Sequence, residues 1–207
     1  MKVIIIGRKA APVLFPGNEC IVAGDPREAA QYGDADLFVD LEFLPEAERV
    51  AALNRLLPSV VMVNAVETTI AEIGSPFVRM NGWPWLCDGA VHELAVGDGD
   101  MAARLPSLYE RLGRGFRVAP DIPGMITARI LAAVINEAWY TWQDGVSSKE
   151  EIDTAMKLGT NYPMGPFEWG ERIGLSRILR LLERMAMKDS RHLAAESLKM
   201  AGGEIKI

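Results

Sequence analysis

The stretch Asp121-Ile-Pro-Gly-Met-Ile-Thr-Ala-Arg129, with a later one, Pro163-Met-Gly-Pro-Phe-Glu168, is the most informative pattern in this chain. Between the two, the sequence predicts a helix over Ile130–Trp142, a turn at Asp144-Gly145, and a second helix that starts at Ser148-Lys-Glu-Glu151. A serine followed three residues later by a glutamate has the form of a capping box, in which each side chain bonds the backbone N–H of the other residue. This order of turns and helix starts predicts an all-helical region.

The composition is typical of a globular protein without a nucleic-acid or membrane surface. Of 207 residues, 49% are apolar and 24% are charged, and the net charge is -6. Because phosphate backbones need clustered Lys and Arg, and no basic run occurs, we expect no nucleic-acid partner. No apolar stretch approaches the roughly 20 residues of a membrane span, so we expect no membrane partner.

Two cysteines, Cys20 and Cys87, are too few and too far apart for a metal-binding or disulfide pattern. We therefore expect no metal site. Few cysteines and no recognisable leader at the N-terminus together favour a reducing, cytoplasmic location.

Residues 1–119 predict a trimmed Rossmann-like domain of the α/β class. Helices are indicated over Glu46–Leu57 and Met101–Leu112, whereas Gly7–Asn18 holds two prolines and is a poor helix. Continuous β-branched runs are typical of strands that are buried on both faces of a parallel sheet. The predicted strands are Val3–Ile6, Cys20–Ala23, Leu37–Leu41, Val60–Val63, Phe77–Met80 and Val91–Val96.

Residues 120–207 predict helices only. The first begins near Pro123 with Asp121 as its cap, and later helices are expected over Pro166–Met187 and Arg191–Met200. We place the domain boundary between residues 119 and 120, where closely spaced prolines favour an extended chain.

This second half resembles the C-terminal domain of the 3-hydroxyacyl-CoA dehydrogenase family. That domain contains D-x-P-G-F-[IV]-x-N-R, an asparagine-glutamate-alanine helix, G-V-[AS]-x-x-x-[ED]-I-D and G-x-N-x-P-M-G-P-F. The resemblance implies an all-α domain of the 6-phosphogluconate/3-hydroxyacyl-CoA dehydrogenase C-terminal type behind a degenerate NAD(P)-binding domain. The matching residues are Asp121, Pro123, Gly124, Arg129, Glu137, Ala138, Gly145, Val146, Ser147, Ile152, Asp153, Gly159, Asn161, Pro163, Met164, Gly165, Pro166, Phe167 and Glu168.

The resemblance also identifies candidate catalytic positions. The family oxidises the 3-hydroxyl of an acyl-CoA with a histidine base, a glutamate that orients it, and a serine and an asparagine that hold the substrate oxygen. Here the serine motif falls on the segment that starts at Asn64, with Val66 at the serine, and the histidine falls on or beside Asn81. The family's asparagine is Ala128, and only Glu93 stands where the orienting glutamate would be. Because an asparagine accepts no proton at pH 7, the resemblance predicts that normal dehydrogenase activity is lost.

The resemblance implies NAD as the cofactor, but its glycine fingerprint is incomplete. A dinucleotide site needs G-x-G-x-x-G after the first strand, and only Gly7 is present, with Lys9 and Pro12 at later positions. Arg8 and Lys9 could receive phosphates through charge. Asp25 stands where a ribose-binding acid belongs, but a turn residue in Gly24-Asp25-Pro26 is the preferred interpretation. Gly7, Arg8 and Asp25 are the candidate cofactor contacts.

Three functional interpretations stay open. The chain could be a degenerate family member that is kept for ligand binding, regulation or as a partner subunit, and the several missing parts favour this one. It could be an active oxidoreductase with an altered base, for which His92 is the nearest imidazole in the sequence. It could also be a dimerisation module. The partners expected by resemblance are an acyl-CoA or another small molecule and a second copy of the chain, paired through the C-terminal helices.

Overall fold

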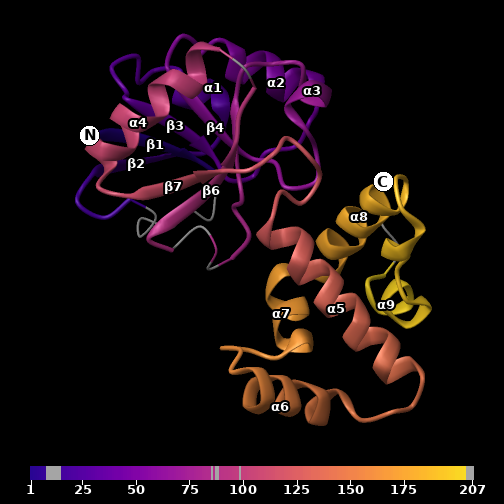
Figure 1. Cartoon of the computed structure of the whole chain (residues 1–207). Helices are drawn as coiled ribbons and strands as arrows, with labels where there is room; N and C mark the ends of the chain where they lie inside the picture. Colours follow the sequence, from indigo (N-terminus) through magenta and orange to yellow (C-terminus); the bar gives the residue numbers. More distant parts are fainter. Residues whose placement is uncertain (8–14, 85, 87–88, 98, 204–207) are drawn as a thin grey trace. The chain divides into compact units, whose positions relative to one another are not determined.

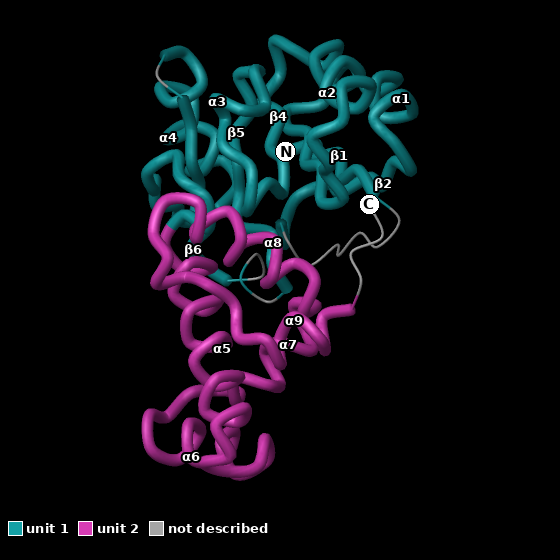
Figure 2. Tube along the Cα trace, turned by 90° about the vertical axis from the view of Figure 1, so that its right-hand side faces the viewer, with its two compact units in different colours: residues 1–125 teal, residues 126–207 magenta. Residues whose placement is uncertain are grey.

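The computed structural model describes residues 1–7, 15–84, 86, 89–97 and 99–203 (Figure 1). The chain divides into two compact units, which are residues 1–125 and 126–207 (Figure 2). The sequence places the boundary at 119/120, whereas the two compact units meet between Met125 and Ile126.

Within the described residues, unit 1 holds a seven-stranded sheet in the order β2-β1-β3-β4-β5-β6-β7. Neighbouring strands are parallel except β5 and β6, which are antiparallel. The predicted Rossmann-like sheet is confirmed, and β7 adds a strand that the sequence did not predict. The strands are β1 (Lys2–Ile6), β2 (Glu19–Ala23), β3 (Leu37–Asp40), β4 (Val60–Asn64), β5 (Val78–Met80), β6 (Val91–Ala95) and β7 (Gly115–Val118).

Both faces of this sheet are buried. On β1, Val3 and Ile5 pack into one hydrophobic cluster, and Ile4 and Ile6 pack into another. Helix α4 covers the first cluster, whereas residues of α1, α2 and α3 belong to the second. Burial on two faces explains why the strands are continuous apolar runs instead of alternating ones. The helices are α1 (Pro26–Ala29), α2 (Ala47–Asn54), α3 (Ile70–Ile73) and α4 (Asp100–Leu112).

The strand order creates a switch point beside β1, whose two neighbours β2 and β3 lie on opposite sides. In doubly wound sheets, ligands bind outside the carboxyl ends of the strands at such a point. Gly7 follows β1, Asn64 ends β4 and Asn81 follows β5. The parallel strands therefore bring the sequence-predicted site residues to one edge of the sheet.

Unit 2 is all helical in its described residues, as predicted. The capping box of α6 is confirmed, because Ser148 and Glu151 exchange both backbone bonds. The predicted single helix over Pro166–Met187 is wrong. It is two helices, since Gly174 between them has a φ of 94°, which interrupts the helical path. The predicted helix over Arg191–Met200 is likewise two pieces. The elements are α5 (Thr127–Gln143), α6 (Lys149–Thr160), α7 (Pro166–Ile173), α8 (Leu175–Ala186), the 3-10 turn η2 (Ser190–His192) and α9 (Glu196–Ala201).

Candidate functional site

Asn81 and Glu93, two of the sequence-predicted catalytic positions, lie in contact. The backbone N–H of Asn81 donates to the carbonyl oxygen of Glu93 at 3.0 Å, which extends the antiparallel pairing of β5 and β6. The side-chain Nδ2 of Asn81 donates to Oε2 of Glu93 at 3.0 Å, and its Oδ1 accepts from the backbone N–H of Trp83 at 3.3 Å. Asn81 is buried, and both the nitrogen and the oxygen of its side-chain amide bond to groups of the protein. An amide has no lone pair that takes up a proton at neutral pH, so this residue supplies hydrogen bonds but no base.

Asn64, the third candidate, joins the ends of several strands. Its Nδ2 donates to the carbonyl oxygens of Leu41 at 3.0 Å and Gly82 at 3.4 Å, and its Oδ1 accepts from the N–H of Gly82 at 3.1 Å. A Cβ on Gly82 would lie 2.5 Å from Cγ of Asn64, so only glycine admits this contact. The geometry gives Asn64 an architectural role at the carboxyl edge.

Glu42 lies over the end of β1. Gly7 has a φ of 134°, and a Cβ built on it would be 3.0 Å from Cγ and 3.5 Å from Oε1 of Glu42. In a doubly wound sheet, the pyrophosphate of a dinucleotide approaches the backbone at this place. A carboxylate here repels an anion through like charge. Glu42 was not singled out from the sequence, although an acid directly after a predicted buried strand was an available signal. Arg8 and Lys9 lie outside the described residues.

Asp25 caps a helix. Its Oδ1 accepts from the backbone N–H groups of Arg27 at 2.7 Å and Glu28 at 2.9 Å, at the start of α1. The bond from Glu28 is the largest cause of a lowered pKa of the Asp25 carboxyl. This is the local role that the turn interpretation expects, and ribose binding by Asp25 stays a prediction.

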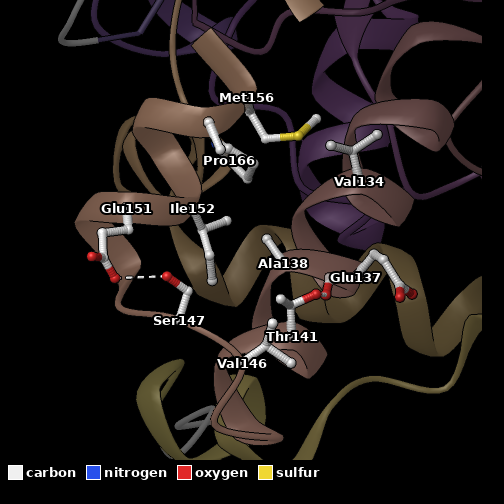
Figure 3. A pocket seen from close by; sticks show the side chains of 11 residues that line it. Val134, Glu137, Ala138, Thr141, Val146, Ser147, Glu151, Ile152, Met156 and Pro166 are labelled. Carbon is white, nitrogen blue, oxygen red and sulfur yellow. Dashed lines mark hydrogen bonds between the residues drawn. The ribbon is translucent and has the colours of Figure 1, made fainter. Parts of the chain in front are cut away.

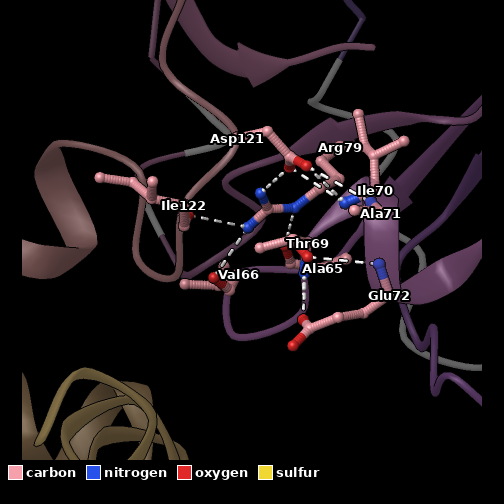
Figure 4. Close-up of polar contacts among 9 residues, drawn as sticks. All are labelled: Ala65, Val66, Thr69, Ile70, Ala71, Glu72, Arg79, Asp121 and Ile122. Carbon is pink, nitrogen blue, oxygen red and sulfur yellow. Dashed lines mark hydrogen bonds and ion pairs between the residues drawn. The ribbon is translucent and has the colours of Figure 1, made fainter. Parts of the chain in front are cut away.

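Asp121 does not cap α5, which corrects the sequence prediction. Helix α5 starts at Thr127, whereas the Asp121 carboxylate accepts from the backbone N–H of Ile70 at 2.9 Å and pairs with Arg79 (Figure 4). Ile70 is the first residue of α3, so the opening residue of the motif serves a helix far away in the sequence. The physical reason is that a carboxylate is stabilised by any helix N-terminus within reach, whether or not it is adjacent in sequence.

Arg79 is the centre of this contact group. Its side chain is fully buried, and it donates through Nε to the carbonyl oxygen of Ala65 at 2.8 Å and through Nη2 to those of Val66 at 3.0 Å and Ile122 at 3.3 Å (Figure 4). Burial lowers the pKa of Arg79 from its ordinary value, and the Asp121 carboxylate opposes that shift. Arg79 was not singled out from the sequence, although a charge inside a predicted buried strand was an available signal.

Val66 stands at the position that the resemblance assigns to the family's serine. Its side chain is buried, and its hydrogen bonds are made by the backbone. Its carbonyl oxygen accepts from Arg79 and, at 2.8 Å, from the backbone N–H of Gly124. Gly124 has a φ of 80°, a conformation that glycine adopts without strain. This motif glycine therefore lets the segment after β7 pass close to the loop after β4.

His92 is a core residue and not a surface one. It is 1% exposed and lies edge-on to the rings of Phe15 and Tyr109, with Nδ1 at 3.0 Å from the Tyr109 hydroxyl. Glu93, the next residue, bonds Asn81 instead. Because successive side chains of a strand point to opposite faces, the structure separates His92 from the Asn81–Glu93 pair.

In unit 2, the second half of the motif builds a helix cap. The buried Asp153 of α6 accepts from the backbone N–H of Phe167 at 2.8 Å through Oδ1 and from that of Glu168 at 3.2 Å through Oδ2. Both donors belong to the first turn of α7. A Cβ on Gly165 would lie 2.1 Å from Cγ of Asp153, so the close approach requires glycine there. Lys157 also pairs with Glu168 at 2.6 Å.

The first turns of α5 carry the remaining motif positions. Ala128, where the family keeps its asparagine, is fully buried. Arg129 Nη2 and Arg191 Nε lie 3.1 Å and 3.2 Å from Nε2 of His192. Burial, followed by the charges of Arg129 and Arg191, lowers the pKa of His192 from its ordinary value. Guanidinium groups only donate, so Nε2 accepts and the imidazole stays neutral.

A cavity of about 440 Å³ lies between α5 and α6 (Figure 3). Side chains of Val134 and Ala138 reach it from α5, and Ile152 and Met156 reach it from α6. At one end Ser147 donates to Glu151 at 2.7 Å. The lining is mostly apolar, so this is a hydrophobic recess in the helical unit.

The described residues hold neither a metal-binding cluster nor a membrane-spanning helix. No group of three or more His, Cys, Asp and Glu side chains is arranged to hold a metal ion among them. No described helix is long and apolar enough to cross a bilayer.

Comparisons with known proteins point to one family. Residues 124–201 match the family described as "3-hydroxyacyl-CoA dehydrogenase, C-terminal domain". Over 87 residues the chain is 47% identical to a 3-hydroxyadipyl-CoA dehydrogenase of Escherichia coli, a match that covers 42% of this chain and 18% of that protein. Over 149 residues it is 32% identical to a probable 3-hydroxybutyryl-CoA dehydrogenase of Deinococcus radiodurans, covering 72% of this chain and 53% of that one. The matches thus span about half, or less, of these curated relatives.

Solved structures agree in fold. The crystal structure of (S)-3-hydroxybutyryl-CoA dehydrogenase from Ralstonia eutropha superposes with a TM-score of 0.71 at 25% identity, over 88% of this chain and 69% of that one. A 3-hydroxybutyryl-CoA dehydrogenase from Escherichia coli gives a TM-score of 0.60 at 33% identity, over 69% of this chain and 31% of that one. The similarity therefore extends from the helical unit into the sheet.

Proposed function

Because this chain belongs to the 3-hydroxyacyl-CoA dehydrogenase family, we propose that it is a member without NAD-dependent dehydrogenase activity that serves as a dimeric scaffold. The observation that carries the first part is the bond from Asn81 to Glu93. By the resemblance to the family, a histidine base would stand at the position of Asn81, and a glutamate at the position of Glu93 would orient it. Here the glutamate receives an amide N–H at 3.0 Å. Oxidation of a hydroxyl to a carbonyl requires that its proton be removed, and the Asn81 amide at the position of the base takes up no proton at neutral pH.

The other substrate-holding positions support the same proposal. Val66 and Ala128 replace the serine and the asparagine, and both side chains are buried hydrocarbon. Neither bonds an oxygen through its side chain. A rescue by His92 is not favoured, since that imidazole lies among Phe15 and Tyr109.

The residues at the switch point do not fit NAD. The fingerprint glycines after Gly7 are missing, and Glu42 lies where the pyrophosphate would approach Gly7. A dinucleotide carries two phosphate charges, which a carboxylate in that place repels.

We predict that the purified chain does not reduce acetoacetyl-CoA with NADH. Addition of protein should leave the absorbance of NADH at 340 nm unchanged, and titration with NADH should leave its fluorescence at the free value. The Glu42→Ala variant removes the carboxylate, so any gain of NADH fluorescence in it alone would identify Glu42 as the obstacle. Turnover by the wild type above a no-protein blank would overturn the proposal. NADH binding without turnover would replace the scaffold with a nucleotide-binding role.

Apolar exposure in unit 2 supports dimeric assembly. Val146 precedes α6 and is 71% exposed, and Leu158 lies within α6 and is 83% exposed. Val146 also lines the cavity between α5 and α6. Exposed apolar surface that adjoins a hydrophobic recess is typical of protein–protein contacts. Burial against a second copy would remove both from water.

We predict that the chain is a dimer in solution and that Val146→Asp makes it monomeric. A buried, unpaired carboxylate opposes association by several kcal/mol, whereas the exposed side chain of Val146 tolerates the change in the free subunit. Light scattering coupled to size-exclusion chromatography measures the mass. Leu44→Asp, at a 53% exposed position of unit 1, is the matched control and should stay dimeric. A monomeric wild type would refute this prediction while leaving the dehydrogenase assay unaffected.

A further inference from the structure

The amino edge of the sheet, opposite the edge of Asn64 and Asn81, holds a second group of polar side chains. The register of β3 and β4 pairs Leu37 with Val60. Asp36 and Ser59 precede these two residues, so they lie next to one another where the adjacent parallel strands begin. A loop at this edge is remote from the switch point at which doubly wound sheets bind their dinucleotide.

Helix α4 adds cationic side chains to the same place. Arg104, Ser107 and Arg111 follow each other at spacings of three and four residues, which puts them on one face of the helix. The opposite side of the helix is apolar and packs on the sheet through Leu105 and Leu112. The polar face of α4 is thereby held beside the start of β3 and β4.

These residues enclose a cavity. Asp36, Ser59, Arg104, Ser107 and Arg111 line a recess of about 270 Å³ within unit 1. That volume is just below the roughly 300 Å³ at which pockets for drug-sized ligands begin. The recess therefore has room for a small ion or a small metabolite and not for a nucleotide cofactor.

The positive charge in the recess exceeds the negative. Arg111 Nη2 lies 2.6 Å from Oδ1 of Asp36, and the backbone N–H of Lys2 donates to Oδ2 of the same carboxylate at 2.8 Å. Asp36 is thus fully engaged by these two groups. Arg104 donates through Nη1 to the carbonyl oxygen of Pro58 and makes no ion pair with any residue that the structure describes. One guanidinium charge remains without a counter-charge, in a chain whose net charge is -6.

We propose that this recess binds a small oxyanion of the phosphate class. The planar fork of Arg104 suits two oxygens of a tetrahedral anion, and a guanidinium is less hydrated than an ammonium and so is well suited to phosphate recognition. The hydroxyl of Ser59 supplies a further donor from the strand side, and Ser107 lies between the two arginines. Free phosphate and a phosphate monoester share this chemistry, and the recess volume admits either.

The test is a titration followed by NMR of the whole chain at constant ionic strength. Inorganic phosphate and glycerol 3-phosphate are the probes, and the backbone amides of Ser59, Val60 and Arg104 report on the recess. Saturable shifts of these amides are expected with at least one probe, and tighter binding of the monoester would identify it as the better ligand class. Arg104→Gln should weaken binding about tenfold, the effect of losing one charge-assisted hydrogen bond.

The matched control is Arg117→Gln, which removes one positive charge from an exposed position of β7. It should bind the probes as the wild type does. Equal weakening in both variants, or shifts that do not saturate, would show general charge attraction and overturn the proposal. Absence of shifts in the wild type at tens of millimolar phosphate would do the same. Thermal melts of each variant without ligand show whether it is folded. If Arg104→Gln does not fold, Arg104→Lys takes its place in the titration. Arg104→Lys keeps the charge but loses the fork, so it should bind with intermediate affinity.

Discussion

Gly165→Val is expected to destabilise unit 2 by about 3–5 kcal/mol, a range set by the cost of leaving a buried carboxylate without its partners. The reason is steric and electrostatic together. A Cβ at this position would lie 2.1 Å from Cγ of Asp153, so the carboxylate must move. When it moves, the backbone N–H groups of Phe167 and Glu168 lose their acceptor at the start of α7. Thermal unfolding followed by circular dichroism should show a melting temperature lower by roughly 10 °C or more.

Gly159 provides the matched control, because a Cβ there meets nothing within 4 Å and it lies inside α6. Gly159→Val adds the same side chain without a clash, and replacing a helical glycine should change stability by less than about 1 kcal/mol. Glu93→Gln keeps the size of a half-buried side chain and should also melt near the wild type. If Gly165→Val and Glu93→Gln melted at the same temperature, the architectural role of the glycine would be refuted.

Arg79→Met is expected to destabilise unit 1 by about 3 kcal/mol, the lower end of the cost of breaking a buried ion pair, since Arg79 is fully buried and Asp121 is 25% exposed. The methionine fills the space of the side chain but donates no hydrogen bond. Asp121 loses its counter-charge, the carbonyl oxygen of Ala65 loses its Arg79 donor, and that of Val66 keeps only the backbone N–H of Gly124. Urea unfolding followed by tryptophan fluorescence measures the free energy of unfolding of the variant against the wild type.

Arg27→Met is the control for this measurement. Arg27 lies 3.8 Å from Glu48 in an ion pair whose side chains are 74% and 91% exposed. Exposed pairs contribute at most about 1 kcal/mol, so this variant should unfold close to the wild type. A similar, small loss in both arginine variants would mean that the buried contact group of Arg79 contributes no more than a surface pair.

The contacts within the candidate site were partly predictable from sequence. Asn81 and Glu93 were singled out from the resemblance, and they meet because β5 and β6 pair antiparallel with Met80 opposite Leu94. Asp25 was weighed as a turn residue, and its short side chain bonds the backbone just after it. The contact of Asp25 follows from a short-range rule, and the contact of Asn81 with Glu93 follows from the pairing of β5 and β6.

Glu42 and Arg79 were not singled out from the sequence, and both lie against residues that are far away along the chain. Glu42 follows β3 but lies over Gly7 at the end of β1. Arg79 pairs with Asp121, which the sequence assigned to its own nearest helix. A carboxylate or guanidinium has several possible partners along a chain, and the local pattern does not rank them.

The sequence by itself determined the two-part architecture, six of the seven described strands of the sheet and the capping box of α6. Each of these follows from apolar periodicity or from side chains a few residues apart, which the chain order already fixes. Only the tertiary structure decided that Asp121 serves α3, that Asp153 caps α7, and that Arg104 and Arg111 face a recess beside β3 and β4. The physical reason is that a buried polar group takes the partner that the packed backbone brings within hydrogen-bond reach, and packing is a property of the whole fold.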